Sequence, residues 1–138
     1  MYDSGMNDVV FSLIHAAHAV EGRLESALAT VGLSVPKLSV LTELASEPEP
    51  LPLSELANRL SCVRSNITQL VDRLESDGLV RRVDDPNDRR SVRAALTPLG
   101  RERQVGGAEQ MERVKAEFCE KLPNADREGL ERILMVFG

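Results

Sequence analysis

Aromatic side chains are scarce in this chain of 138 residues, which contains three Phe, one Tyr and no Trp. The core must therefore be built mainly from Leu, Val, Ile and Ala, and a core of that kind favours helices packed on helices. Hydrophobic residues make up 42% of the chain and charged residues 28%, values that are ordinary for a globular protein. A chain of this length is expected to form one domain.

Cysteine is also scarce, and Cys62 and Cys119 are the only two. We interpret both as small hydrophobic residues of the core, with oxidant sensing as the alternative. The longest largely apolar stretch, residues 9–20, is shorter than the roughly 20 residues that span a bilayer, so no membrane association is expected. Asp3 and Asp8 stand where a signal peptide would be cationic. These features together predict a cytoplasmic protein.

Groups suited to catalysis are equally few. The chain has no Gly-rich phosphate loop and no Cys/His or Ser/His arrangement of a known catalytic type, so we expect neither an enzyme nor a cofactor. His15 and His18 lie one helical turn apart, with Glu21 next on the same face, but a zinc site needs further ligands. We interpret the two His as polar groups of an interface or of an effector pocket, with a metal site as the alternative.

The formal net charge of −5 argues at first against nucleic acid as a partner. The charge is unevenly distributed, however. Residues 59–103 contain ten Arg and seven acidic residues, whereas the rest of the chain is strongly acidic. Binding to phosphates depends on the local density of cations rather than on the total charge, so this segment remains suited to nucleic acid.

Hydrophobic periodicity predicts a mainly α-helical fold with six helices. Gly32 and Gly78 are placed to end the first and the fourth helix. Ser34 is placed to cap the second, and the proline-rich segment 47–52 is predicted to be a connector that cannot be helical. The other helices are predicted at 7–31, 54–60, 64–77, 98–121 and 125–137.

The charged stretch Asp85–Ser91 lies between two short segments that can pair as a β-hairpin. We expect Arg89 and Arg90 near its tip, where an Arg side chain is long enough to enter the minor groove of DNA. Asp88 is placed to hold the Arg90 guanidinium through paired hydrogen bonds. The alternative is a plain surface turn with a weak ion pair. The two strands are predicted at 79–83 and 92–96.

The fourth predicted helix presents uncharged polar and Arg side chains opposite its apolar stripe, instead of the Glu and Lys that are typical of a merely solvated face. Asn and Gln can bond adenine, Arg can bond guanine, and Ser or Thr can bond phosphates or base edges. A helix of this kind followed by an Arg-tipped hairpin predicts a winged helix-turn-helix that binds double-stranded DNA. The residues predicted to contact the major groove or phosphates are Arg64, Ser65, Asn66, Thr68, Gln69 and Arg73.

Several segments, in this order along the chain, resemble the MarR (multiple antibiotic resistance regulator) family: Leu53–Ala57, Asn66–Glu75, Gly78–Val80, Asp85–Arg90, and Leu96 and Thr97 with Gly100. The resemblance implies a homodimeric winged-helix transcription factor, usually a repressor. Such a protein binds a pseudo-palindromic operator and is released by a small molecule, such as a phenolic compound, or by an oxidant. The resemblance also implies that Arg90 enters the minor groove with Asp88 as its support, and that residues 64–73 lie in the major groove.

Two positions depart from the family pattern. Val63 and Pro52 stand where relatives usually have a residue that caps the following helix. A lost cap typically costs about 1 kcal/mol, so we expect the start of each helix to be held in another way. Neither change touches the predicted base-reading face.

The whole chain, residues 1–138, is thus expected to be a single MarR-like domain of six helices with a two- or three-stranded β-wing. Residues 35–97 form the predicted winged helix-turn-helix lobe. The N- and C-terminal helices, 1–33 and 98–138, form the predicted dimerisation lobe, with a closed monomeric bundle as the alternative. Their apolar residues exceed what a small winged helix needs to cover itself: Leu13, Leu24, Leu28, Leu130, Ile133 and Phe137.

Gly106 and Gly107 interrupt the fifth predicted helix, where each Gly costs about 1 kcal/mol relative to Ala. They form either a flexible joint between the lobes or a site of close backbone packing. For the function, two alternatives to an effector-released repressor stay open. One is a redox- or metal-responsive regulator of the same fold. The other is a winged helix used as a protein-interaction module, which should have lost the Arg residues that this chain retains.

Overall fold

The computed structural model of the protein describes residues 4–61 and 64–138, with side chains from residue 8 to 61 and from 66 onwards. The fold is mainly helical with one small antiparallel sheet, as predicted. The helices are α1 (Ser4–Ala29), α2 (Val35–Ala45), α3 (Leu53–Arg59), α4 (Arg64–Ser76), α5 (Pro98–Lys121) and α6 (Asn124–Met135). The strands are β1 (Leu51–Pro52), β2 (Val80–Asp85) and β3 (Asp88–Leu96).

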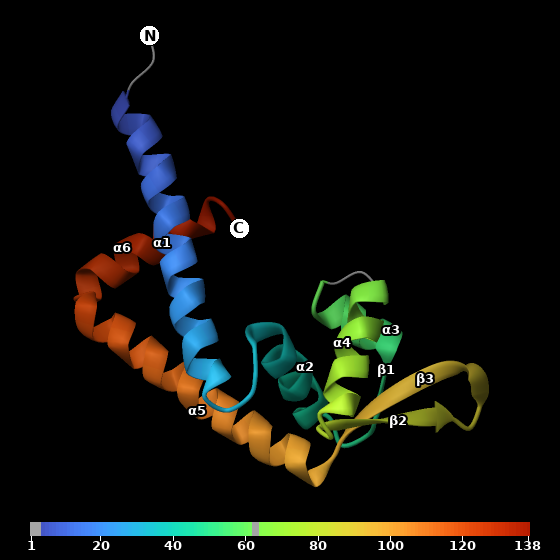
Figure 1. The fold of residues 1–138 in the computed structure, drawn as a ribbon. Coiled ribbons are helices and arrows are strands. Elements are labelled where there is room, and N and C mark those ends of the chain that lie inside the picture. Colours follow the sequence, from blue (N-terminus) through green and yellow to red (C-terminus); the bar gives the residue numbers. More distant parts are fainter. Residues whose placement is uncertain (1–3, 62–63) are drawn as a thin grey trace.

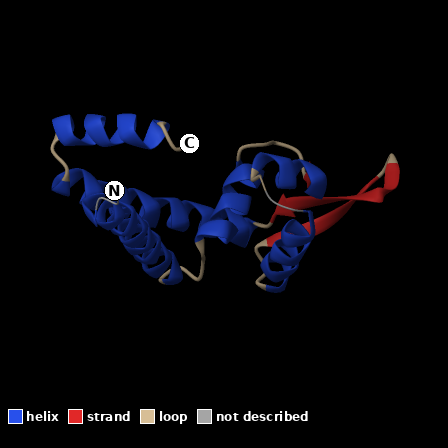
Figure 2. Cartoon of the chain, turned by 90° about the horizontal axis from the view of Figure 1, so that it is seen from above, coloured by secondary structure: helices blue, strands red, loops and turns tan. Residues whose placement is uncertain are grey.

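The elements form two lobes (Figures 1 and 2). The winged lobe holds α2, α3, α4 and the three strands, and the helical lobe holds the long helices α1 and α5 together with α6. The lobes are joined through α5, which packs against both α1 and α2. The hairpin of β2 and β3 projects from the winged lobe, away from the long helices. α6 turns back from the end of α5, and none of its residues is buried.

Local signals end most helices close to the predicted positions. Gly32 and Gly78 follow α1 and α4 with positive φ angles of 72° and 78°, the left-handed conformation that glycine adopts without a steric penalty. The Ser34 side chain accepts a hydrogen bond from an amide in the first turn of α2. Pro52 makes no capping bond to α3. Glu55 instead places a negative charge in the first turn of that helix, where it interacts favourably with the helix dipole.

β3 is the central strand of the sheet, with β1 and β2 as its antiparallel neighbours. The predicted hairpin is confirmed, but the strands extend beyond the predicted 79–83 and 92–96. Pairing continues out to Asp85 and Asp88, so the turn itself is only two residues, 86–87. Most of the predicted loop therefore belongs to β3. The end of the proline-rich connector forms β1, the third strand that the sequence left open without giving its position.

The hydrophobic core lies in the winged lobe and reaches the C-terminal end of α1. Leu28, Leu41 and Leu56 are fully buried there, and Ala94 closes the core from the sheet side. The apolar stripe of α4 is buried as predicted: Ile67, Val71 and Leu74. In the part of the chain that the structure describes, no helix is long and apolar enough to cross a membrane.

Gly106 and Gly107 have different surroundings although they are neighbours. A Cβ atom on Gly107 would lie 2.8 Å from the Cδ1 atoms of both Leu33 and Leu38, which belong to the core. A Cβ atom on Gly106 would meet only Val31 Cγ1, at an ordinary 3.8 Å. The absence of a side chain at Gly107 thus allows α5 to pack closely against α2 and against the turn that precedes α2. This favours close backbone packing over a flexible joint as the role of the glycine pair.

We expect Gly107→Ala to lower the free energy of unfolding by about 1–3 kcal/mol, because two buried Leu side chains must shift to make room. Gly106→Ala should be neutral or should stabilise the protein by up to about 1 kcal/mol, since Ala is the better helix former. Thermal or denaturant unfolding of the two single variants measures both effects. Similar changes at the two positions would contradict the packing explanation.

Candidate nucleic-acid interface

The exposed face of α4 carries the polar side chains that the sequence predicts there. α4 buries its apolar stripe against the core and turns the opposite face outwards. Asn66, Gln69 and Arg73 are exposed, and Thr68 is half-buried at the edge of this face. Arg64–Ser65 form the start of the helix, and their side chains lie outside the described part of the structure. Asn66, Gln69 and Arg73 thus place hydrogen-bonding groups on the surface of the winged lobe.

Only four residues, 60–63, separate α3 from α4, so the two helices form a helix-turn-helix. The two helices pack against each other. Ser61, in the turn, has a φ of 51°, a left-handed conformation that is uncommon for residues other than glycine. Cys62, interpreted as a core residue, and Val63, interpreted as a missing cap, lie outside the described residues.

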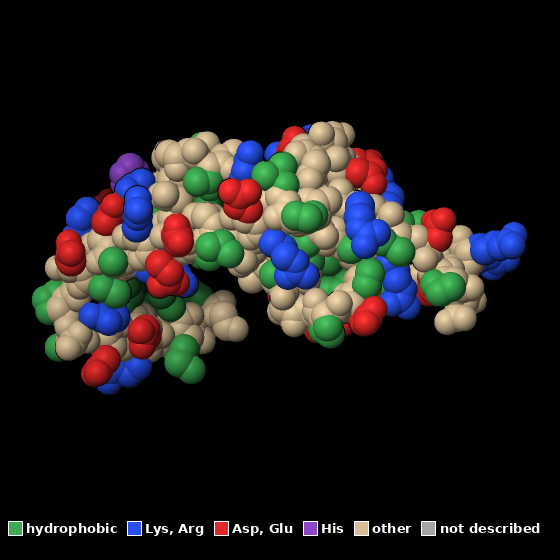
Figure 3. All heavy atoms as spheres, turned by 90° about the horizontal axis from the view of Figure 1, so that it is seen from below, with side chains coloured by type: hydrophobic (Ala, Val, Ile, Leu, Met, Phe, Trp, Pro, Cys, Tyr) green, Lys and Arg blue, Asp and Glu red, His purple; other side chains and the backbone are tan. Residues whose placement is uncertain are grey.

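The three predicted wing residues, Asp88, Arg89 and Arg90, are all exposed near the projecting end of the hairpin. Figure 3 shows basic side chains gathered at that end. The structure corrects one detail, because Asp88 Oδ1 accepts a hydrogen bond from the Arg90 backbone amide at 2.9 Å instead of from the guanidinium. An Asp side chain commonly accepts a hydrogen bond from the backbone amide two residues ahead of it. Asp88 therefore fixes the backbone that carries Arg90.

Among the Arg side chains of the cationic segment that the structure describes, three are engaged in ion pairs within the winged lobe. Hydrogen bonds raise the pKa of Arg59, with Glu47 as the largest cause, and the pKa of Arg82, with Asp72 as the largest. Positive charge for an external partner thus comes from the exposed Arg73, Arg81, Arg89, Arg90 and Arg101. The pairs are Arg59 with Glu43, Glu47 and Glu55, Arg82 with Asp72 and Glu75, and Arg93 with Asp85.

Arg93 ties the hairpin to the proline-rich segment. Its Nη2 and Nε donate to Asp85 Oδ2 at 3.1 and 3.3 Å, and its Nη1 donates to the carbonyl oxygen of Pro50 at 3.3 Å. The pKa of the Asp85 carboxyl lies below its usual range, first because it accepts a hydrogen bond from the Asn87 amide and then because of Arg93. One ionised carboxylate thus both closes the turn and holds the neighbouring strand.

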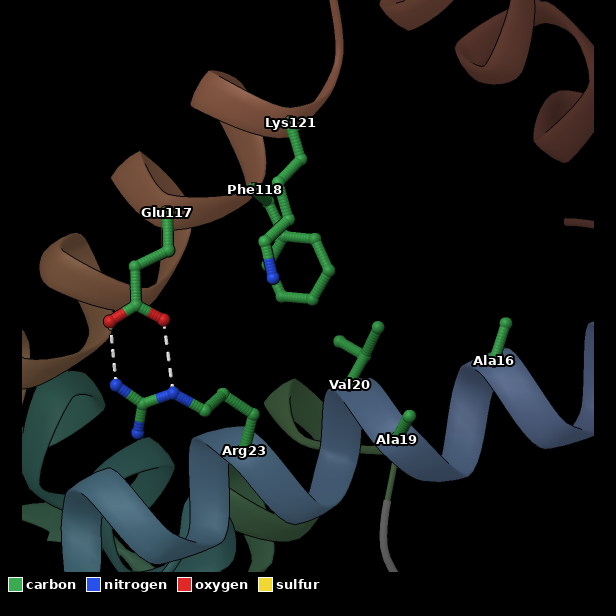
Figure 4. Close-up of a pocket in the computed structure, with 7 residues that line it drawn as sticks. All are labelled: Ala16, Ala19, Val20, Arg23, Glu117, Phe118 and Lys121. Atoms are coloured by element: carbon green, nitrogen blue, oxygen red, sulfur yellow. Dashed lines mark hydrogen bonds and ion pairs between the residues drawn. The ribbon is translucent and has the colours of Figure 1, made fainter.

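A hollow of about 350 Å³ lies between α1 and α5 in the helical lobe. Figure 4 shows Phe118 and Val20 facing each other across it, with Arg23 and Glu117 joined at one end. Arg23 Nη2 and Nε donate to the two carboxylate oxygens of Glu117 at 2.6 and 2.9 Å. The remaining lining residues are Ala16, Ala19 and Lys121. The sequence did not predict this hollow, because its residues come from two helices far apart along the chain.

Cys119 is not where the sequence placed it, whereas the interpretation of His15 and His18 as polar groups of an interface or an effector pocket stays a prediction. Both His side chains are exposed, and neither lines the hollow between α1 and α5. Cys119 is exposed rather than part of the core. Within the described ranges, no group of three or more His, Cys, Asp or Glu residues is arranged to hold a metal ion.

A helix-turn-helix with an exposed polar second helix, followed by a projecting antiparallel hairpin, defines the winged helix-turn-helix class. Residues 33–92 match the sequence model of the MarR family. The solved structures of Sco3205 and CouR share the fold over nearly the whole chain. The protein belongs to the MarR family.

Curated relatives and solved structures agree with this assignment. TtmR, an HTH-type transcriptional regulator of Methylorubrum extorquens, is 38% identical over 95 residues, which cover 69% of this chain and 48% of TtmR. The chain spans about half the length of the curated relatives that it matches first. Sco3205, a MarR family regulator from Streptomyces coelicolor solved in complex with DNA, is 29% identical with a TM-score of 0.84, over 99% of this chain and 88% of that one.

CouR has been solved in two states that resemble this chain. CouR from Rhodococcus jostii RHA1 bound to p-coumaroyl-CoA is 29% identical, with a TM-score of 0.75, over 96% of this chain and 92% of that one. The transcriptional repressor CouR bound to a 23-mer DNA duplex is 27% identical, with a TM-score of 0.84, over 99% of this chain and 98% of that one.

Proposed function

We propose that the protein is a DNA-binding transcriptional regulator that acts as a homodimeric repressor of a pseudo-palindromic operator. The observation that carries the proposal is the pairing, in one lobe, of an exposed polar helix face with an Arg-bearing hairpin. Asn66, Gln69 and Arg73 of α4 are suited to base edges in the major groove. Arg90 is suited to the narrow, strongly negative minor groove beside it. Sco3205 and CouR, which share the fold, have been solved with DNA.

The homodimer follows from unpartnered apolar surface in the helical lobe. All but two of the large hydrophobic side chains that are exposed in the described ranges lie on α1 or at the C-terminal end. Apolar area of this extent is typical of an interface between subunits rather than of a monomer surface. A two-fold dimer places two recognition helices about one DNA turn apart, which fits a pseudo-palindromic operator. The apolar residues are Val9, Val10, Phe11, Leu13, Ile14, Leu130, Ile133, Leu134, Met135, Val136 and Phe137.

The effector of the proposed repressor is a small organic acid, of which a phenolic acid is one example. The hollow between α1 and α5 has apolar walls, and its rim carries Lys121 beside the ion pair of Arg23 with Glu117, which leaves one net positive charge. Such a site suits an apolar body with a negative group. CouR, with the same fold, binds p-coumaroyl-CoA. His15 and His18 remain polar groups for a site completed by a second subunit.

Duplex binding that weakens steeply with salt is the expected result of a direct test. Salt dependence arises because bound Arg side chains release counterions from the phosphates. For six or more phosphate contacts, affinity should fall by about a thousandfold between roughly 50 and 200 mM salt. The measurement is footprinting on the DNA upstream of the protein's own gene, together with selection from a random-sequence duplex library. Recovery of no duplex at low salt would overturn the proposal.

The same assay, repeated with small aromatic acids, metal ions and peroxides, identifies the signal. Release by an aromatic acid alone supports the proposed effector class. Release by peroxide or metal would instead favour the redox- or metal-responsive alternative.

A further inference from the structure

Arg82 links the root of the hairpin to α4 through both its side chain and its backbone. Arg82 Nη1 donates to Glu75 Oε1 at 2.9 Å, and Nη2 donates to Asp72 Oδ1. The Arg82 backbone amide donates to Glu75 Oε2 at 3.1 Å. Glu75 thus receives two hydrogen bonds from one residue of β2, and the three bonds made by Arg82 join α4 to β2.

The position of the two acids is unexpected for a helix proposed to bind DNA. Asp72 follows Gln69 at three-residue spacing on the exposed side of α4, and it stands directly before Arg73. A carboxylate there repels phosphates, so by electrostatics alone its removal would strengthen binding. The acids therefore need a role that outweighs this repulsion, and their shared partner is a wing residue.

We propose that Asp72, Glu75 and Arg82 form a clamp that sets the direction of the hairpin relative to α4. All three are positioning residues, and the proposal rests on the proposed DNA-binding function. By placing Arg90 at a fixed distance and angle from the base-reading face, the clamp allows both elements to enter their grooves at the same time.

The geometry of the hairpin explains why such a clamp matters. Beyond Val80 and Ala94, which are buried, β2 and β3 are only partly covered, and the residues around the turn are exposed. The strand from Arg82 to the start of the turn at Pro86 measures about 13 Å at roughly 3.3 Å per residue. A rotation of about 10° at the root therefore moves the tip by about 2 Å, which is larger than the tolerance of a hydrogen bond.

The clamp is separable from folding, because its side chains are a third to a half exposed. The exposed fractions are 30% for Arg82, 55% for Asp72 and 41% for Glu75. Ion pairs with this exposure contribute little to stability. Substitutions in the clamp should therefore leave the fold intact and change DNA binding specifically.

The decisive variant is the double substitution Asp72→Asn with Glu75→Gln, which removes two negative charges. We expect it to bind about tenfold more weakly than the wild type, although electrostatics alone predicts tighter binding. Arg82→Gln should cause a similar loss, and the triple variant should be no worse than either. Asp77→Asn is the matched control, because Asp77 follows the same helix and forms an ion pair with Lys37 of α2, not with the wing. This control should bind as well as the wild type or better.

The measurement uses a duplex that the wild-type protein recovers from a random-sequence library, with circular dichroism to verify folding. In an Arg90→Ala background, the double substitution should have almost no further effect, since the clamp acts through Arg90. Failure of the wild type to recover any duplex would refute the proposed function itself. With wild-type binding established, a double variant that binds as tightly as the wild type, or a loss that is additive with Arg90→Ala, would overturn the clamp alone.

If the double variant were unfolded, two single variants that each retain part of the clamp, Glu75→Gln and Arg82→Lys, would replace it. Both should show intermediate losses of DNA affinity, and unchanged binding by both would also overturn the clamp.

Discussion

Replacing Arg90 with Ala is expected to weaken duplex binding by about 1–3 kcal/mol for each wing, or roughly tenfold to a hundredfold. Arg90 is exposed near the end of the projecting hairpin, and Asp88 fixes its backbone through a hydrogen bond to the Arg90 amide. Because the backbone that carries the guanidinium is already fixed, the side chain can enter a narrow minor groove without a large loss of backbone freedom. Electrophoretic mobility shift or fluorescence anisotropy with a selected duplex measures the change.

The base composition beneath the wing distinguishes minor-groove insertion from a simple phosphate contact. Narrow minor grooves belong to A·T-rich segments, so exchanging A·T for G·C pairs in the flanks should weaken wild-type binding. The Arg90→Ala variant should be insensitive to the same exchange. A variant that loses equal affinity on both duplexes would show that Arg90 contacts only a phosphate.

Arg81→Ala is the matched control for this prediction. Arg81 is an exposed Arg of the same hairpin, but it lies at the root, where it pairs in register with Ala95 rather than near the turn. It removes the same charge and should cause a smaller loss that does not depend on the sequence of the flanks. Equal, sequence-dependent losses at both positions would assign the effect to the charge of the hairpin as a whole.

The sequence predicted the features of the fold that depend on neighbouring residues. Gly32, Gly78 and Ser34 mark helix ends because each acts on the turn of backbone beside it. The buried stripe of α4 follows from a periodicity that is visible within one helix. The winged helix-turn-helix class was predicted on the same grounds, since it depends on the order of these elements.

Features that depend on how distant elements cross were not predictable in this way. The ten Arg of residues 59–103 looked equivalent, yet Arg82 faces two acids on α4 and Arg81, one residue earlier, does not. Gly107 and Gly106 looked equivalent until α5 was packed against Leu33 and Leu38. The hairpin was predicted too short, because charged residues in strands look like a loop when their pairing partner is unknown.

The same reasoning applies to the helical lobe, where the apolar pattern was visible in the sequence but the structure leaves most of these side chains exposed. Leu130 was predicted to be in an interface, and within one subunit it is 38% exposed on a helix that has no buried residue. Burial of such side chains in a homodimer removes apolar area from water and stabilises the pair. The alternative, a monomeric bundle, would leave this surface in water.

Leu130→Glu is therefore expected to dissociate the proposed dimer. An unpaired carboxylate buried in each of two symmetric positions costs at least about 2 kcal/mol per copy, so the dimer Kd should rise by roughly a thousandfold. Operator affinity should fall as well, because a subunit bound at one half-site no longer holds its partner close to the other half-site. Analytical ultracentrifugation measures the association, and footprinting measures the operator.

Leu99→Glu is the matched control, since it introduces the same charge at a Leu with 39% exposure, close to that of Leu130. Leu99 lies at the start of α5 beside Gly78, at the junction with the winged lobe rather than on the apolar surface of α1 and the C-terminal end. We expect this variant to remain dimeric. Because the two substitutions are chemically identical and equally exposed in the monomer, a difference between them must come from the second subunit, and equal behaviour would contradict the proposed interface.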